Sequence, residues 1–248
     1  SSTTPWYAIL MLVGLVGSAW WWGRRFRAQP TMIVVYMGGL LVALFCSKVG
    51  YVSVELHFEV CVNDFFFKAA TCKTILGALL GGYGGVEAGK WLIGHTQATG
   101  DAFAVVVPAA LALGRVGCVL HGCCTGVACE RAAWWTIADP AGVPHWPAQP
   151  VEMTFNLVMA VVLLVLWRRG RLTGQLFHVY LIAYAAFRFV HEWLRDTPRL
   201  TPWLSTYQVL ALVLLAFALW RYQSRAARRE GEAFPGAAEP WGGTSART

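Results

Sequence analysis

The chain has 248 residues, of which 57% are hydrophobic and only 13% are charged, and its mean hydropathy is +0.51. Soluble domains are usually about a quarter charged, so this composition predicts an integral membrane protein. The net charge of +7 does not indicate nucleic-acid binding, because the arginines stand in short clusters after apolar runs without interleaved base-stacking residues. We therefore expect a membrane protein with no nucleic-acid partner.

Apolar stretches of about the 20-residue length that crosses a bilayer follow one another along the chain. They predict an all-α fold of seven transmembrane helices, approximately at residues 5–23, 31–51, 74–94, 102–120, 151–167, 174–193 and 203–221. The start of the chain has neither the basic flank nor the small-residue cleavage pattern of a signal peptide, which favours a retained first span. We expect a membrane domain at 1–222 and a polar tail at 223–248.

The third predicted span is rich in glycine. Its glycines are Gly77, Gly81, Gly82, Gly84, Gly85 and Gly89. Small residues let the backbones of neighbouring membrane helices approach closely. This span is therefore predicted to be a close-packing helix.

Lysine and arginine are unevenly shared between the two ends of the predicted spans. The ends that follow spans 1, 3, 5 and 7 hold eleven of these residues, against five at the opposite ends. By the positive-inside rule, the N-terminus lies outside and the C-terminal tail is cytoplasmic. In a bacterium this predicts a multi-pass protein of the inner membrane, with its outer end facing the periplasm.

Six charged residues fall within or beside the spans at the predicted outer end. They are Lys48, Arg115, Glu152, Arg188, Glu192 and Arg195. An ionised arginine near the bilayer core costs roughly 2.5–3.5 kcal/mol, so such residues mark functional sites. Positive charges outnumber negative ones here, which predicts an anionic ligand, and arginine forks suit phosphate. The alternative is an Arg–Glu pair that only holds helices together.

Segment 113–126 adds a histidine and three cysteines beside Arg115. The thiols could act as nucleophiles or as soft metal ligands, or could form disulfides. The disulfides would be Cys61–Cys72 and a pair among Cys118, Cys123, Cys124 and Cys129. The spacing fits no standard zinc-finger template, and adjacent cysteines rarely ligate together at a structural site. We therefore predict no metal and no cofactor.

Five short motifs follow one another from residue 6 to residue 195. They are Trp6-Tyr7, Lys48-Val-Gly-Tyr51, Gly114-Arg-Val-Gly117 with Gly122 and Gly126, Trp146-Pro-Ala-Gln149 with Glu152, and Phe187-Arg-Phe-Val-His-Glu-Trp-Leu-Arg195. In order and spacing they resemble motifs of the bacterial prolipoprotein diacylglyceryl transferase family. Members of this family are seven-helix membrane enzymes. The resemblance implies transfer of diacylglycerol from phosphatidylglycerol to a protein cysteine, with a thioether formed and glycerol phosphate released.

The resemblance also implies roles for individual residues. Arg115 and Arg188 would hold the lipid phosphate, Glu192 would orient Arg188 or bind headgroup hydroxyls, and Gln149 with Glu152 would brace the outer loop. The glycines would allow close approach of the backbone. The predicted substrate-binding residues are Lys48, Tyr51, Cys118, Gly122, Gly126, Gln149, Glu152, Glu192 and Arg195.

Several positions depart from the family's motifs. The histidine of its third helix is missing from segment 80–85, and Trp146 replaces a histidine. Its two signature asparagines and its glutamate are Cys118, His121 and Cys123. We therefore predict catalytic roles for Arg115, Arg188, His121 as the substitute base, and Cys123 (or Cys118) as a candidate nucleophile.

Several functions stay open at these positions. The favoured one is transfer of a diacylglyceryl or related lipid group from an anionic phospholipid to a thiol acceptor, which is a prolipoprotein or a variant acceptor. The alternative is a redox or metal-binding thiol protein on the same scaffold without transferase activity.

Overall fold

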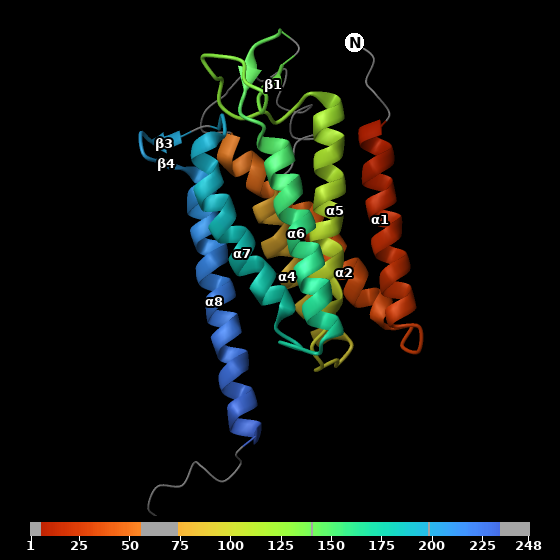
Figure 1. The fold of residues 1–248 in the computed structure, drawn as a ribbon. Helices are drawn as coiled ribbons and strands as arrows, with labels where there is room; N and C mark the ends of the chain where they lie inside the picture. Colours follow the sequence, from red (N-terminus) through yellow and green to blue (C-terminus); the bar gives the residue numbers. More distant parts are fainter. Residues whose placement is uncertain (1–5, 56–73, 140, 198, 234–248) are drawn as a thin grey trace, which may run out of the picture.

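The structure is a computed structural model and describes residues 6–55, 74–139, 141–197 and 199–233. Within these residues the chain forms seven α-helices (Figure 1). They are α1 (Trp6–Arg25), α2 (Met32–Glu55), α4 (Ile75–Leu92), α5 (Gly100–His121), α6 (Ala148–Arg168), α7 (Leu176–His191) and α8 (Thr206–Ala233). Each predicted span therefore falls on a helix.

Among the described residues, four helices are long and apolar enough to cross a membrane. These segments are Met32–Val52, Gly100–His121, Ala148–Arg168 and Thr206–Ala226. The fold is mostly helical, as the sequence predicts, and two short antiparallel hairpins stand in the connections. They pair β1 (Ile137–Ala138) with β2 (Pro144–His145), and β3 (Arg199–Thr201) with β4 (Leu204–Ser205).

Helix α8 differs from its prediction at the C-terminal end. It continues to Ala233, past residue 222 where we expected a polar tail to begin. Residues 223–233 contain alanine, arginine and glutamate, which are strong helix formers, so the helix extends after the apolar pattern has ended. The domain boundary itself stays a prediction.

The helices run side by side, so that their connections gather at two ends (Figure 1). The β1–β2 and β3–β4 hairpins lie at the same end as the start of α1, and α8 ends at the other. Between the helices is a core in which Tyr180, Tyr184 and Leu214 are completely buried. Large apolar side chains such as Leu12 and Phe45 are exposed on the outside, as expected of a surface that faces lipid.

Helices α2 and α4 approach closely along the glycine face of α4. A Cβ atom at Gly77 would lie 2.5 Å from the Cys46 carbonyl oxygen, and one at Gly85 would lie 2.5 Å from the Gly38 carbonyl oxygen. At Gly81 it would collide with the Cys46 side chain. The predicted close-packing helix is therefore confirmed.

We expect Gly81→Ala to lower the stability of the protein by about 1–3 kcal/mol, because the added methyl group overfills the contact between α2 and α4. Gly84→Ala is a matched control on the same helix, since a Cβ there would meet nothing within 4 Å. Unfolding of the two purified variants in detergent measures the difference. Equal stability of both variants would contradict the close packing.

Candidate active site

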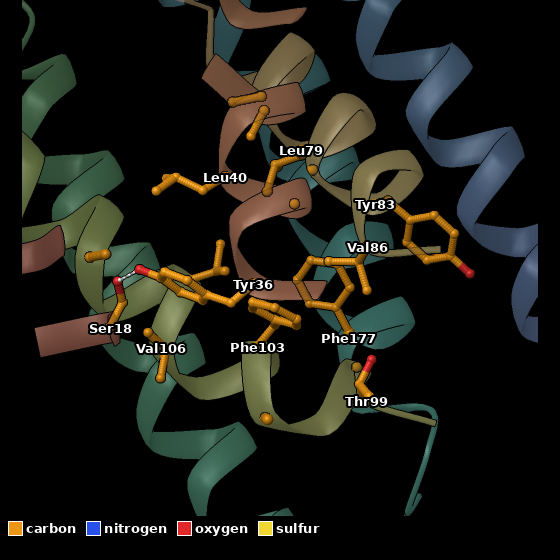
Figure 2. A pocket seen from close by; sticks show the side chains of 18 of the residues that line it. Ser18, Tyr36, Leu40, Leu79, Tyr83, Val86, Thr99, Phe103, Val106 and Phe177 are labelled. Carbon is orange, nitrogen blue, oxygen red and sulfur yellow. Dashed lines mark hydrogen bonds between the residues drawn. The ribbon is translucent and has the colours of Figure 1, made fainter. Parts of the chain in front are cut away.

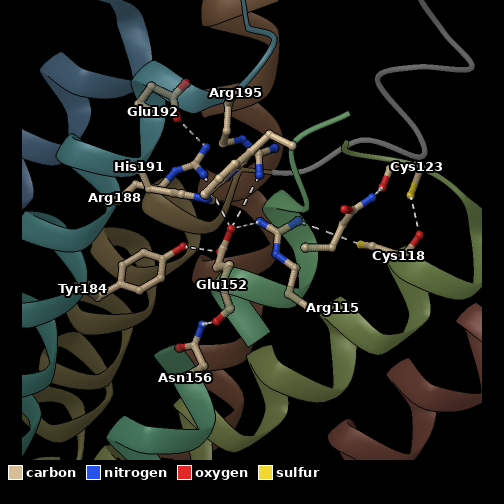
Figure 3. Close-up of polar contacts among 12 residues, drawn as sticks. Arg115, Cys118, Cys123, Glu152, Asn156, Tyr184, Arg188, His191, Glu192 and Arg195 are labelled. Carbon is tan, nitrogen blue, oxygen red and sulfur yellow. Dashed lines mark hydrogen bonds and ion pairs between the residues drawn. The ribbon is translucent and has the colours of Figure 1, made fainter. Parts of the chain in front are cut away.

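A buried carboxylate stands at the centre of the charged cluster (Figure 3). Glu152, near the start of α6, is 0% exposed and pairs with arginines from three different segments. Its Oε2 atom lies 2.6 Å from Nη2 of Arg115, which α5 supplies. It also lies 3.5 Å from Nη1 of Arg188 on α7 and 3.5 Å from Nη1 of Arg195. The cluster therefore joins residues that are far apart in the sequence.

Further polar side chains hold Glu152 and a second carboxylate of the cluster, Glu192, in place. Tyr184 donates a hydrogen bond of 2.9 Å to Oε1 of Glu152. Glu192 pairs with Nη2 of Arg188 at 2.8 Å and accepts a hydrogen bond of 2.6 Å from the Thr197 hydroxyl. Glu192 thus holds the Arg188 guanidinium, and its role towards a substrate stays a prediction.

The cluster holds more positive than negative charge. Three arginines face two carboxylates, which leaves one positive charge in a buried site. Within the described part of the chain, four buried guanidinium nitrogens lack a hydrogen-bond partner: Arg115 Nε, Arg188 Nη1, Arg195 Nε and Arg195 Nη1. Burial lowers the pKa of Arg195, and the adjacent Arg188 and Arg115 act in the same direction. The site is therefore suited to an anion that accepts hydrogen bonds.

Three residues of this hydrogen-bond network were not predicted from the sequence, namely Asn156, Tyr180 and Tyr184. Asn156 donates a hydrogen bond of 2.9 Å to the Glu152 carbonyl and accepts one of 2.8 Å from the Tyr180 hydroxyl. Asn156 stands four residues after Glu152, and Tyr180 and Tyr184 stand at four-residue steps before Arg188. Because residues four apart share a helix face, this spacing is a signal that could have found them.

The outer loop reaches the cluster through Gly126. The Gly126 amide donates to the Trp146 carbonyl at 3.0 Å, and Gly126 forms an antiparallel bridge with Arg195. A Cβ atom here would lie 2.5 Å from the Leu194 carbonyl oxygen, so the close approach predicted for this glycine is confirmed. Gln149 braces the loop as expected, since its Nε2 donates to the Cys123 carbonyl at 2.6 Å.

Three thiols meet just beyond the end of α5. The helix ends in a Schellman motif, in which the Gly122 amide donates to the Val119 carbonyl and the Cys123 amide to the Cys118 carbonyl. Gly122 is left-handed with φ +68°, and Cys124 follows with φ +63°. The turn brings the sulfur atoms of Cys118, Cys123 and Cys124 within 4.8 Å of one another.

The thiols adjoin the arginine cluster. Arg115 Nη1 donates a hydrogen bond of 3.9 Å to the sulfur of Cys118 (Figure 3). Hydrogen bonds from Cys118 and Cys123 lower the pKa of Cys124, and the charge of Arg115 acts in the same direction.

The disulfide hypothesis is not supported at the described positions. Cys118, Cys123, Cys124 and Cys129 are all free thiols. The hypothetical pair Cys61–Cys72 lies outside the described residues.

The remaining predicted residues have different surroundings. His121 is the last residue of α5 and is exposed, whereas His191 is buried and accepts a hydrogen bond of 3.2 Å from Trp146. The lone pair of His191 Nε2 is thereby occupied, so His191 does not replace His121 as the candidate base. Lys48 and Tyr51 lie partly buried towards the C-terminal end of α2, and their role in substrate binding stays a prediction.

Comparisons with known proteins agree on one family. The chain is 28% identical over 235 residues to the phosphatidylglycerol–prolipoprotein diacylglyceryl transferase of Dehalococcoides mccartyi strain BAV1, and 88% of each chain is covered. It is also 28% identical over 244 residues to the protein of the same name from Nitratidesulfovibrio vulgaris strain DP4, with 87% of this chain and 88% of the relative covered. No solved structure matches the chain.

The family profile described as "Prolipoprotein diacylglyceryl transferase" matches residues 2–223, which is nearly the whole chain. The matched range includes every helix that contributes to the cluster around Glu152. The chain therefore belongs to the prolipoprotein diacylglyceryl transferase family of membrane transferases.

Proposed function

We propose that this protein transfers a diacylglyceryl group from an anionic phospholipid, such as phosphatidylglycerol, to an acceptor thiol on a prolipoprotein or a related molecule. The observation that carries this proposal is the set of buried guanidinium nitrogens without hydrogen-bond partners around Glu152. A lipid phosphate would accept those hydrogen bonds and balance the surplus positive charge. The names of the relatives support the same donor and acceptor.

The arginines would act on the leaving group. When the thiol sulfur attacks the glyceryl carbon, the bond to the phosphate oxygen breaks and its electron pair stays on glycerol phosphate. Fixed, buried donors that meet this developing charge stabilise the transition state more strongly than water does. Arg115, Arg188 and Arg195 are held for this by Glu152 and Glu192. In this scheme His121 takes the proton of the acceptor thiol.

The acyl chains need apolar space, and a cavity in the helical bundle offers it (Figure 2). The cavity has a volume of about 230 Å³ and is lined by Leu40, Leu79, Phe103 and Phe177, among other residues. Its lining also includes Leu111, which stands four residues before Arg115 on α5. We place an acyl chain of the donor in this cavity, with the phosphate at the arginines.

The topology belongs to the same proposal. All seven helices would cross a bacterial inner membrane, with the N-terminus and the cluster at the periplasmic end and the tail after residue 222 in the cytoplasm. Arginines at 24, 25, 168, 169 and 225 lie on the opposite end, where the positive-inside rule places the cytoplasm. The comparisons give no support to a redox or metal protein without transferase activity.

The test is a transfer assay with the purified full chain. The protein is reconstituted in vesicles that contain phosphatidylglycerol and is given a peptide with one cysteine. We expect the peptide to gain the mass of a diacylglyceryl group, with release of glycerol phosphate. Vesicles of phosphatidylcholine alone are the control. An unmodified peptide under conditions where a known family member modifies it would overturn the proposal.

A further inference from the structure

The geometry points to a zinc site formed by the thiolates of Cys118, Cys123 and Cys124, with its fourth coordination position open to an acceptor thiol. The sequence alone predicts no metal here, because the spacing matches no standard template. The proximity of the cysteines becomes visible only in the fold, because the turn after α5 brings three sulfur atoms within 4.8 Å of one another. All three are free thiols.

The distances suit zinc. A Zn–S bond of about 2.3 Å places the sulfur atoms of a tetrahedral site about 3.8 Å apart. The three sulfur atoms therefore need to approach one another by at most about 1 Å, which side-chain rotation can supply. Thiolates are soft ligands that select zinc or copper(I) over magnesium or calcium.

The number of ligands distinguishes this site from a structural one. Structural zinc sites are closed by four protein ligands, whereas catalytic sites use three and leave the fourth position to water or substrate. Cys118 is buried, but Cys124 is exposed, so an incoming ion and a thiol can reach the cluster from its side. The described part of the chain adds no fourth ligand to this group.

Charge also favours an occupied site. Three thiolates and one Zn²⁺ ion carry one net negative charge, which the adjacent Arg115 guanidinium attracts. Arg115 joins the thiols to the arginine cluster, since it lies 2.6 Å from Glu152 and 3.9 Å from the Cys118 sulfur. Gln149 fixes the backbone between the ligands through its hydrogen bond to the Cys123 carbonyl.

The role of the ion rests on the proposed transferase function. An acceptor thiol that binds zinc is held as a thiolate, and its proton passes to His121, the base of the proposed scheme. Its sulfur then attacks the glyceryl carbon, the bond from this carbon to the phosphate oxygen breaks, and glycerol phosphate leaves with the electron pair. The thioether product is a weaker ligand and dissociates. Zinc would thus activate the thiol in a chain that lacks the family's histidine on the third helix.

The first experiment measures metal binding without reference to activity. The full chain, purified in detergent under reducing conditions, is titrated with Zn²⁺ against a chromophoric chelator. It is also loaded with Co²⁺, whose bonds to thiolates absorb in the near ultraviolet. We expect one ion per chain and a thiolate–cobalt band. Cys118→Ser and the double variant Cys123→Ser with Cys124→Ser should lose both.

Cys129→Ser is the matched control. Cys129 is a free, partly buried thiol in the same loop, outside the group of three, so this variant should bind zinc as the wild type does. Thermal unfolding of each variant without metal separates loss of the site from loss of the fold. Absence of zinc binding by the wild type, equal loss in Cys129→Ser, or a disulfide among the three cysteines under these conditions would overturn the site.

The second experiment separates the ion's role from the proposed function. Transfer to the peptide thiol is measured with zinc-loaded protein, after chelation, and after zinc is returned. We expect transfer to be lost and then restored. Full transfer by the chelated protein would overturn the role of zinc and leave the proposed function standing. A zinc-loaded protein that transfers nothing would overturn the proposed function and leave the metal site standing.

Discussion

Arg195→Gln is expected to lower the rate of diacylglyceryl transfer by roughly 10²–10³-fold, the usual cost of removing one fixed donor from a site of charge development. Arg195 suits this test because its structural contacts are the weakest of the three arginines. Its ion pair with Glu152 measures 3.5 Å, and its Nε and Nη1 atoms are buried without a hydrogen-bond partner in the described residues. Transfer from phosphatidylglycerol to a peptide cysteine measures the effect.

Two further variants show whether the loss belongs to this position. Arg131→Gln removes an exposed arginine of the outer loop and should leave the transfer rate unchanged. Arg195→Lys keeps the charge but loses the planar fork, so its rate should lie between those of the wild type and Arg195→Gln. If Arg195→Gln transfers at the wild-type rate, Arg195 does not stabilise the leaving phosphate.

Glu152→Gln is expected to lower the free energy of unfolding by about 3–5 kcal/mol. Glu152 is the only carboxylate among the described residues that pairs with all three arginines of the cluster. Without its charge, these buried guanidinium groups repel one another and keep a single carboxylate, Glu192, as their partner. Denaturation in detergent, followed by tryptophan fluorescence, measures the loss against Glu130→Gln, a control in the exposed part of the loop.

A double variant identifies repulsion as the cause. Removing one of the crowded arginines should relieve part of the strain, so Arg195→Gln added to Glu152→Gln should recover some of the lost stability. Strictly additive losses in the double variant would mean that Glu152 stabilises the fold through contacts other than those with Arg195.

The helices could be predicted from the sequence because a bilayer demands about 20 apolar residues for each span. Every predicted span falls on a helix. The two hairpins could not be predicted, since each has only two or three residues per strand and they lie among loop contacts such as the bridge between Ala128 and His145 of β2. The length of α8 was missed because its last turns follow helix propensity after the apolar pattern has stopped.

The arginines of the site were predictable, but their arrangement was not. Arg188 and Glu192 stand four residues apart, as an ion pair on one helix face does, and charge within a predicted membrane span indicates function. Glu152 was expected to brace the loop, yet its side chain lies at the centre of the arginines. That position depends on how α5, α6 and α7 pack, which no single segment encodes.

The arrangement of the three thiols could not be predicted from the sequence either. Adjacent cysteines argued against a shared ligand site, because spacing alone does not show the two left-handed residues in the turn, Gly122 and Cys124. These conformations place Cys123 and Cys124 beside Cys118 in the last turn of α5. Only the folded backbone shows that the three sulfur atoms meet.

The claim that the buried arginines hold a lipid phosphate is tested most directly by measuring which phospholipid the purified protein retains. Wild-type protein and Arg195→Gln are purified in mild detergent from membranes with mixed phospholipids, and bound lipid is measured by native mass spectrometry. We predict that the wild type retains phosphatidylglycerol in preference to phosphatidylethanolamine, and that the variant loses this preference. Equal retention of phosphatidylglycerol by the two proteins, or no preference in the wild type, would contradict the claim.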